Sequence, residues 1–203
     1  MKEYINKAMT YVEYEKLIDG LLEDGKTTGA NQSAAMFGYG SLNRHRMLRL
    51  AKTVEINERT RAAAKRVTRP MTWLILTEGW CGDAAQNVPV IEKIAAESDK
   101  IETLYILRDE NIDLMDRFLT NGKRSIPKLI ALDAGTLAVL GSWGSRPAAA
   151  QRVFADMKTK GVGNAAIHEE IQRWYNADKS ESIQREFEIL LAEWDEESVA
   201  VAA

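Results

Sequence analysis

The alternation of strand-like and helix-like patterns in the middle of the chain restricts its fold most strongly. Three short apolar runs have the length and composition of buried strands: 71–77, 101–107 and 127–133. Helical patterns follow the first two runs: 83–98 and 112–121. Gly135 then indicates a turn into a hairpin partner at 136–140, and a helix is expected from Arg146-Pro147. This order, β-α-β-α-β-β-α, predicts an α/β fold with a mixed sheet, because the first crossover makes its two strands parallel.

The two ends of the chain have helical patterns only. Apolar residues recur at helical spacing over 10–23, and a second helical stretch is expected from Ser33 towards Arg66. Two further helices are expected after the central region, around 165–175 and 180–194, and the last residues, 196–203, are expected to fray. The sequence therefore predicts three segments: an N-terminal helical extension, an α/β domain and a C-terminal helical extension, at 1–66, 67–160 and 161–203.

Charge and composition restrict the partners. The net charge is −3 over 203 residues and no long basic run is present, so nucleic acid is not an expected partner. The sequence shows neither a signal-peptide pattern nor a run of membrane-spanning length, so a cytoplasmic location without membrane contact is expected. The chain has one cysteine and so cannot form an internal disulfide. The oligomeric state is not predicted.

The single cysteine lies at a chemically favourable position. Cys81 stands between the first predicted strand and the helix that follows it, in the stretch Glu78-Gly-Trp-Cys-Gly-Asp-Ala84. A thiol in the first turn of a helix is close to unpaired backbone N–H groups and to the positive end of the helix dipole. Both favour the thiolate, which is the nucleophilic form of the side chain.

This arrangement resembles the thioredoxin fold over roughly residues 67–160. The similarity rests on five features: Trp80-Cys81-Gly82 at the first strand-to-helix turn, Pro89 in the next helix, Asp109-Glu-Asn111 after the second strand, Ser125-Ile-Pro127 before the third strand, and Gly135 at the hairpin. The motif is similar to that of bacterial thioredoxin-family proteins with helical flanks. The resemblance implies a cis peptide bond before Pro127, with the backbone of Ile126 turned towards the sulfur.

The chain departs from the thioredoxin pattern at three positions. The second cysteine of thioredoxins is replaced by Ala84, the proline between the cysteines by Asp83, and the buried aspartate of the preceding strand by Ile75. Without a second thiol, the protein cannot release a mixed disulfide by itself. An external thiol, such as glutathione or another low-molecular-weight thiol, is therefore the expected resolving partner, and no bound cofactor or metal is predicted.

Two opposing effects act on the reactivity of Cys81. The helix terminus lowers the pKa of the thiol, whereas the carboxylates of Asp83 and Glu78 raise it by like-charge repulsion. Asp83 is also the candidate acceptor of the thiol proton, and capping of the helix is its alternative role. We expect a partly activated thiol, with Cys81 and Asp83 as the catalytic residues.

The predicted substrate-binding residues surround this thiol: Trp80, Gly82, Arg124, Ile126 and Pro127. The backbone of Ile126 would pair with an extended substrate by strand addition. Arg124, with Lys123 and Lys128, would attract the carboxylates of an anionic thiol, unless these cations are only solvated surface charges.

Three hypotheses for the function follow. The first is monothiol exchange with protein or small-molecule disulfides through Cys81. The second is a redox-silent binding module that uses the surface between Trp80 and Pro127. In the third, Cys81 is a small buried apolar residue.

Two other patterns are weaker. Gly20 to Thr27 matches the phosphate-loop spacing, but it follows a helical pattern and carries Glu23 and Asp24, so a helix end is expected there. His45 and His168 have no partner at metal-ligand spacing, so surface or packing roles are expected.

Overall fold

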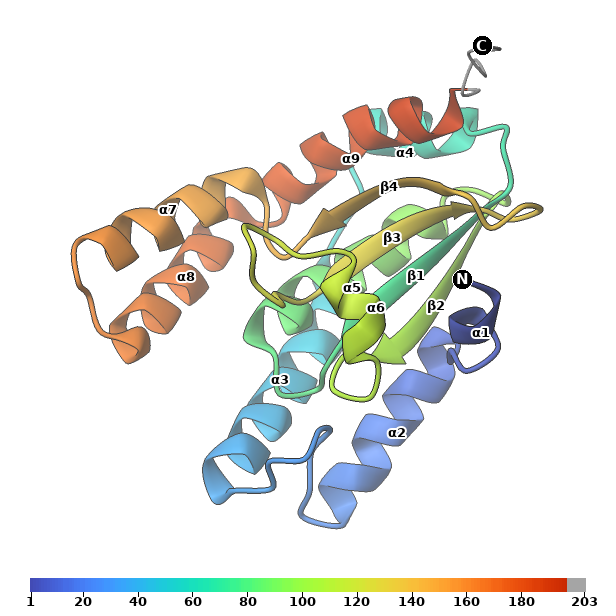
Figure 1. Ribbon diagram of the computed structural model, residues 1–203. Helices are drawn as coiled ribbons and strands as arrows, with labels where there is room; N and C mark the ends of the chain where they lie inside the picture. Colours follow the sequence, from blue (N-terminus) through green and yellow to red (C-terminus); the bar gives the residue numbers. More distant parts are fainter. Residues whose placement is uncertain (197–203) are drawn as a thin grey trace.

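The computed structural model describes residues 1–196, so 197–203, within the end predicted to fray, lies outside the described residues. Figure 1 shows the arrangement of the elements, whose bounds are α1 Lys2–Ile5, α2 Tyr11–Glu23, α3 Ala34–Thr53, α4 Glu58–Arg66, β1 Met71–Thr77, α5 Gly82–Ala95, β2 Ile101–Leu107, α6 Ile112–Asp116, β3 Lys128–Asp133, β4 Val139–Gly144, α7 Ala148–Thr159, α8 Asn164–Asp178 and α9 Glu181–Asp195.

A mixed sheet with the strand order β2-β1-β3-β4 forms the centre of the molecule. β1 pairs in parallel with β2 and antiparallel with β3, which pairs antiparallel with β4. Every residue of β1 is buried, because the strand is paired on both sides and covered on both faces, and this explains its continuous apolar run. The predicted α/β fold with a mixed sheet and additional helices is confirmed.

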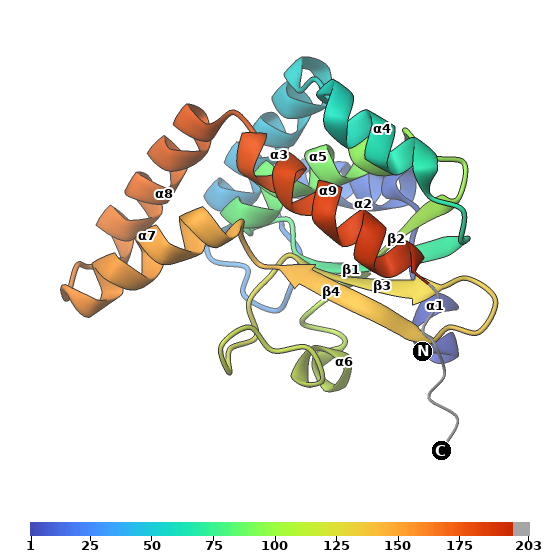
Figure 2. The same ribbon diagram turned by 90° about the horizontal axis from the view of Figure 1, so that it is seen from above.

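Helices cover the sheet unequally. Figure 2 shows α3, α4, α5 and α9 on one face and the short α6 on the other. On the first face, the ring of Trp73 from β1 packs against Phe187 and Trp194 of α9, at centroid distances of 5.3 and 5.8 Å. One buried cluster includes residues from all three predicted segments, from Tyr14 in α2 to Trp194 in α9.

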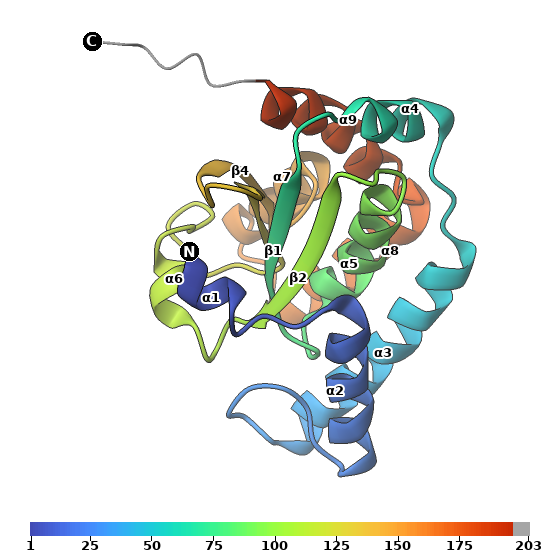
Figure 3. The same cartoon turned by 90° about the vertical axis from the view of Figure 1, so that its right-hand side faces the viewer.

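The N-terminal segment protects the open edge of the sheet. The backbone groups of Met9 and Tyr105 pair with each other, which adds an antiparallel bridge alongside β2. Figure 3 shows the chain between α1 and α2 running past β2. Because an exposed edge strand invites pairing with another chain, this bridge reduces the exposed part of that edge.

Three predicted boundaries were wrong, and local side-chain hydrogen bonds explain two of them. The stretch from Ser33 is two helices, because Asn57 Oδ1 accepts the Thr60 N–H at 2.9 Å and begins a new helix. The hairpin partner starts at Val139, since Asp133 Oδ1 accepts the backbone N–H groups of Gly135 and Thr136 and lengthens the turn. The helix predicted over 112–121 ends at Asp116. Ser33 does cap α3, as expected, with Oγ accepting the Met36 N–H at 3.4 Å.

Helices α7 and α8 form a hairpin that projects from one end of the sheet (Figure 1). It has its own small buried cluster, formed by Ile167, Ile171 and Tyr175 of α8, against which partly buried side chains of α7 pack. This hairpin lies at the end of the sheet where the predicted site is located.

Candidate functional site

The sheet topology brings four separate loops to one end of the sheet. β1, β2 and β4 run in the same direction, so the residues that follow them lie at the same end of the sheet. β3 runs in the opposite direction, so the residues that precede it lie there too. The loops therefore gather Cys81 after β1, Arg108 after β2, Ile126-Pro127 before β3 and Arg146 after β4.

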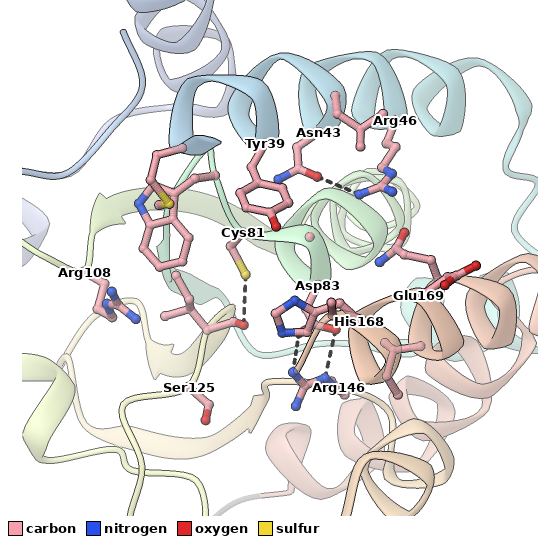
Figure 4. A pocket seen from close by; sticks show the side chains of 18 of the residues that line it. Tyr39, Asn43, Arg46, Cys81, Asp83, Arg108, Ser125, Arg146, His168 and Glu169 are labelled. Atoms are coloured by element: carbon pink, nitrogen blue, oxygen red, sulfur yellow. Dashed lines mark hydrogen bonds and ion pairs between the residues drawn. The ribbon is translucent and has the colours of Figure 1, made fainter. Parts of the chain in front are cut away.

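The thiol of Cys81 has two hydrogen-bond partners, both in the backbone. Cys81 is the N-cap of α5, and its Sγ accepts the Ala84 N–H at 3.4 Å. The thiol donates its proton to the carbonyl oxygen of Ile126 at 3.3 Å, as Figure 4 shows. The Ile126–Pro127 peptide bond is cis. Only 8% of Cys81 is exposed, and the residue lines a pocket. The two backbone hydrogen bonds hold the thiol in a fixed position there.

The surroundings of Cys81 favour the neutral thiol. Burial, followed by repulsion from the Asp83 carboxylate, raises the pKa of Cys81 to about 12. The N–H groups of Ala84 and Asp83 and the charge of Arg146 act in the opposite direction but do not compensate. A group that donates a hydrogen bond to a carbonyl is itself stabilised in its protonated form. At neutral pH the thiol is therefore protonated.

Asp83 is occupied by other partners. Its carboxylate forms a two-pronged ion pair with the guanidinium of Arg146, with N–O distances of 2.6 and 2.9 Å. The hydroxyl of Tyr175 donates to the same carboxylate at 3.0 Å. Burial raises the pKa of Asp83, and the pairing with Arg146 opposes that shift. Arg146 precedes α7 and Tyr175 belongs to α8, so their contacts with Asp83 join α5 to the α7–α8 hairpin.

A pocket of about 520 Å³ opens beside the thiol. Its floor contains Trp80, Cys81 and Gly82, and its far walls come from α3 and α8. Figure 4 shows Arg46 on α3 and Arg146 beyond β4 approaching the pocket from opposite sides. Most of the exposed lining surface is apolar, as in small-molecule sites, but four arginines and two carboxylates also contribute to it.

The family comparison follows the same region of the chain. Residues 29–158, which contain the sheet, the thiol and the cis peptide bond, match the family described as thioredoxin. The chain belongs to the thioredoxin family.

Two solved structures share the thioredoxin-family fold seen here. A crystallised protein of unknown function from Pseudomonas aeruginosa is 18% identical with a TM-score of 0.55, and the match covers 91% of this chain and 98% of that one. An HIV epitope-scaffold is 16% identical with a TM-score of 0.54 and the same coverage of both chains. At these identities the similarity concerns the fold alone. No curated protein matches this sequence.

The predicted site residues of this thioredoxin-family protein lie near one another. Trp80, Gly82 and Ile126 line the pocket together with Cys81 and Asp83. Pro127, the residue after Ile126, is buried and is not among the lining residues of this pocket.

The cations expected to attract a substrate have other partners. Arg124 lines the pocket, but its guanidinium pairs with Asp116 at 2.6 Å. Lys128 is buried and its Nζ donates to the carbonyl of Gly144 at 3.2 Å. Neither Arg124 nor Lys128 therefore has its charged group free to pair with a ligand.

Several lining residues were missed by the sequence reasoning. The main ones are Tyr39, Arg46, Arg146, His168 and Gln172. They belong to the helices outside the central pattern or, for Arg146, to the loop that leads into α7. One indirect indication was present in the sequence, and only for Arg146. This residue precedes Pro147 at the expected start of a helix.

Two further observations concern other classes of site. Within residues 1–196, no group of three or more His, Cys, Asp and Glu side chains is arranged to hold a metal ion. None of the helices in that range combines the length and the apolar character needed to cross a membrane.

Proposed function

We propose that this thioredoxin-family protein is a binding module, which holds a small molecule or an extended segment in the pocket between Trp80 and Ile126. In this proposal Cys81 is a protonated thiol that fixes the backbone of Ile126 and forms part of the pocket floor. The observation that carries the proposal is the hydrogen bond from the buried thiol to the Ile126 carbonyl.

Three properties of the thiol support this function over catalysis. The pKa of Cys81 is raised by burial and by Asp83, so little thiolate exists at neutral pH. The candidate proton acceptor, Asp83, is held by Arg146 and Tyr175. Cys81 is the only cysteine of the chain, so no internal thiol can resolve a mixed disulfide.

Monothiol exchange remains the second candidate because Sγ lines the pocket and accepts an N–H group at the start of α5. In that reaction Cys81 attacks a disulfide R–S–S–R, forms a mixed disulfide and releases one R–SH. A second external thiol then attacks the mixed disulfide and restores Cys81.

Mass spectrometry after incubation with oxidised glutathione separates the two candidates. The binding proposal predicts no glutathione adduct on the native protein at pH 7, and an adduct once guanidinium chloride has unfolded the chain. Cys81→Ser is the control for adducts elsewhere. An adduct that forms on the native protein as fast as on the unfolded chain would establish exchange chemistry instead.

A further inference from the structure

One arginine of the pocket differs from the others in its partners. Arg46 projects from α3 into the pocket wall and is half-buried. Its side chain donates to Asn43 Oδ1 at 2.9 Å, an interaction drawn in Figure 4. An amide oxygen carries no net charge, so this contact orients the guanidinium without neutralising it.

The other arginines of the pocket are all paired with carboxylates. Their partners are Asp109 for Arg108, Asp116 for Arg124 and Asp83 for Arg146, each at 2.6 Å. For Arg46, no carboxylate of residues 1–196 lies within 4.0 Å of the guanidinium. Glu169 also lines the pocket, but its carboxylate pairs with Arg173 at 2.5 Å. Arg46 is therefore the arginine of this pocket whose charge is left for a ligand.

A second donor lies beside Arg46. Gln172 of α8 uses its Oε1 to accept a hydrogen bond from Gln86 at 2.9 Å. This leaves its Nε2 near Gly82, where a Cβ would stand 3.5 Å from that nitrogen and 3.7 Å from Arg46 Nη1. Since Gly82 has no side chain, the space below both donors stays open.

Apolar and polar side chains both border these donors. Tyr39 and Leu42 of α3 and Ile171 of α8 line the pocket, and the first two are about half exposed. His168 and Glu169 of α8 line it as well. An exposed apolar wall beside an unneutralised guanidinium suits a ligand with an anionic group and an apolar body.

We propose that this end of the pocket binds a small carboxylate with an apolar body, whose carboxylate pairs with Arg46 and accepts a hydrogen bond from Gln172. The body lies over Gly82 against Tyr39 and Leu42, on the side of the pocket away from Arg146. The inference rests on the proposed binding function and names its ligand class.

A matched pair of probes tests the charge requirement. 3-Phenylpropionate and 3-phenylpropanamide share one apolar body and differ in the charge of the head group, and their binding is measured by titration followed by heteronuclear NMR. The wild-type protein should bind the acid about tenfold or more tightly than the amide, as expected for a charge-assisted pair. The Arg46→Met variant should bind both probes with equal affinity.

Arg49→Met is the matched control, because Arg49 is an exposed arginine on the same helix that does not line the pocket. It should keep the preference for the acid, and circular dichroism checks the fold of both variants. Three outcomes would overturn the inference. The wild type could bind acid and amide with equal affinity, it could bind neither, or the preference for the acid could survive Arg46→Met. Equal binding of the two probes would overturn the carboxylate site and leave the binding module intact, whereas a glutathione adduct that forms on the native protein as fast as on the unfolded chain would refute both the module and the inference that rests on it.

Discussion

At the scale of single residues, the pKa of the Cys81 thiol depends on its burial and on the charged groups around it. The start of α5 offers N–H groups that favour a thiolate, but burial and the Asp83 carboxylate favour the neutral form more strongly. The ion pair with Arg146 favours the charged form of Asp83, whereas burial raises the pKa of that carboxyl. The position of a cysteine at a helix terminus is therefore not sufficient to activate it.

Asp83→Asn should lower the pKa of Cys81. The substitution removes the repelling carboxylate and leaves the positive charge of Arg146 nearby, and both changes favour the thiolate. We expect alkylation of the thiol by iodoacetamide at pH 9 to be several-fold faster than in the wild type. Glu169→Gln changes an exposed carboxylate of the same pocket and should leave the rate unaltered. A rate that Asp83→Asn leaves unchanged would show that burial alone sets the pKa.

The proximity of Cys81 and Ile126 could be predicted from the sequence, because the motifs around Cys81 and Pro127 resemble those of the thioredoxin fold and that resemblance implies it. The sequence was insufficient for Arg46 and Gln172. These residues reach the pocket only through the packing of α3 and α8 against α5, and their local sequence resembles that of any solvated helix face. The partners of Asp83 were equally hidden, since Arg146 and Tyr175 lie far from it along the chain.

At the scale of elements, the α7–α8 hairpin is attached to the rest of the molecule by polar groups. The hydroxyl of Tyr175 donates to Asp83 and accepts from Asn87 at 2.8 Å, and Gln172 accepts from Gln86. The apolar cluster of the hairpin is separate from the main core, so the loss of these polar contacts should loosen the hairpin without unfolding the sheet.

Tyr175→Phe tests this attachment. Removing the hydroxyl leaves Asn87 and Asp83 each without one partner, which should cost about 1–3 kcal/mol in local stability. Hydrogen exchange measured by mass spectrometry should become faster in α8, while exchange in β1 and β3 stays unchanged. Tyr39→Phe, which removes the hydroxyl of a half-exposed tyrosine on α3, is the control. Equal acceleration in the sheet would show that the hairpin is not a separate unit.

At the scale of the whole molecule, the helical ends and the central sheet share a core. Phe187 of α9 is fully buried and contacts three tryptophans: Trp73, Trp143 and Trp194. On the same helix, Ile189 is 58% exposed. The helix over 180–194 was predicted from its sequence pattern, but its partner on β1 could not be, because helix periodicity defines a face and not what covers it.

Phe187→Ala should therefore destabilise the entire protein. Loss of the buried ring should cost about 3–5 kcal/mol, whereas Ile189→Ala should change stability by less than about 0.5 kcal/mol. Urea unfolding should show one transition, coincident by circular dichroism and by tryptophan fluorescence, with its midpoint lowered only in Phe187→Ala. A separate early transition of the helical ends would contradict a shared core.

The protonation state of Cys81 is the central claim, and its single thiol makes a direct measurement possible. The rate of alkylation by iodoacetamide is followed against pH for the native protein and for the chain unfolded in guanidinium chloride. The unfolded chain should show a midpoint near that of a free thiol, about 8.5–9. The native rate should still be rising, without a plateau, at the highest pH where circular dichroism shows the native fold, because the pKa is raised to about 12. A native midpoint at or below that of the unfolded chain would contradict this account.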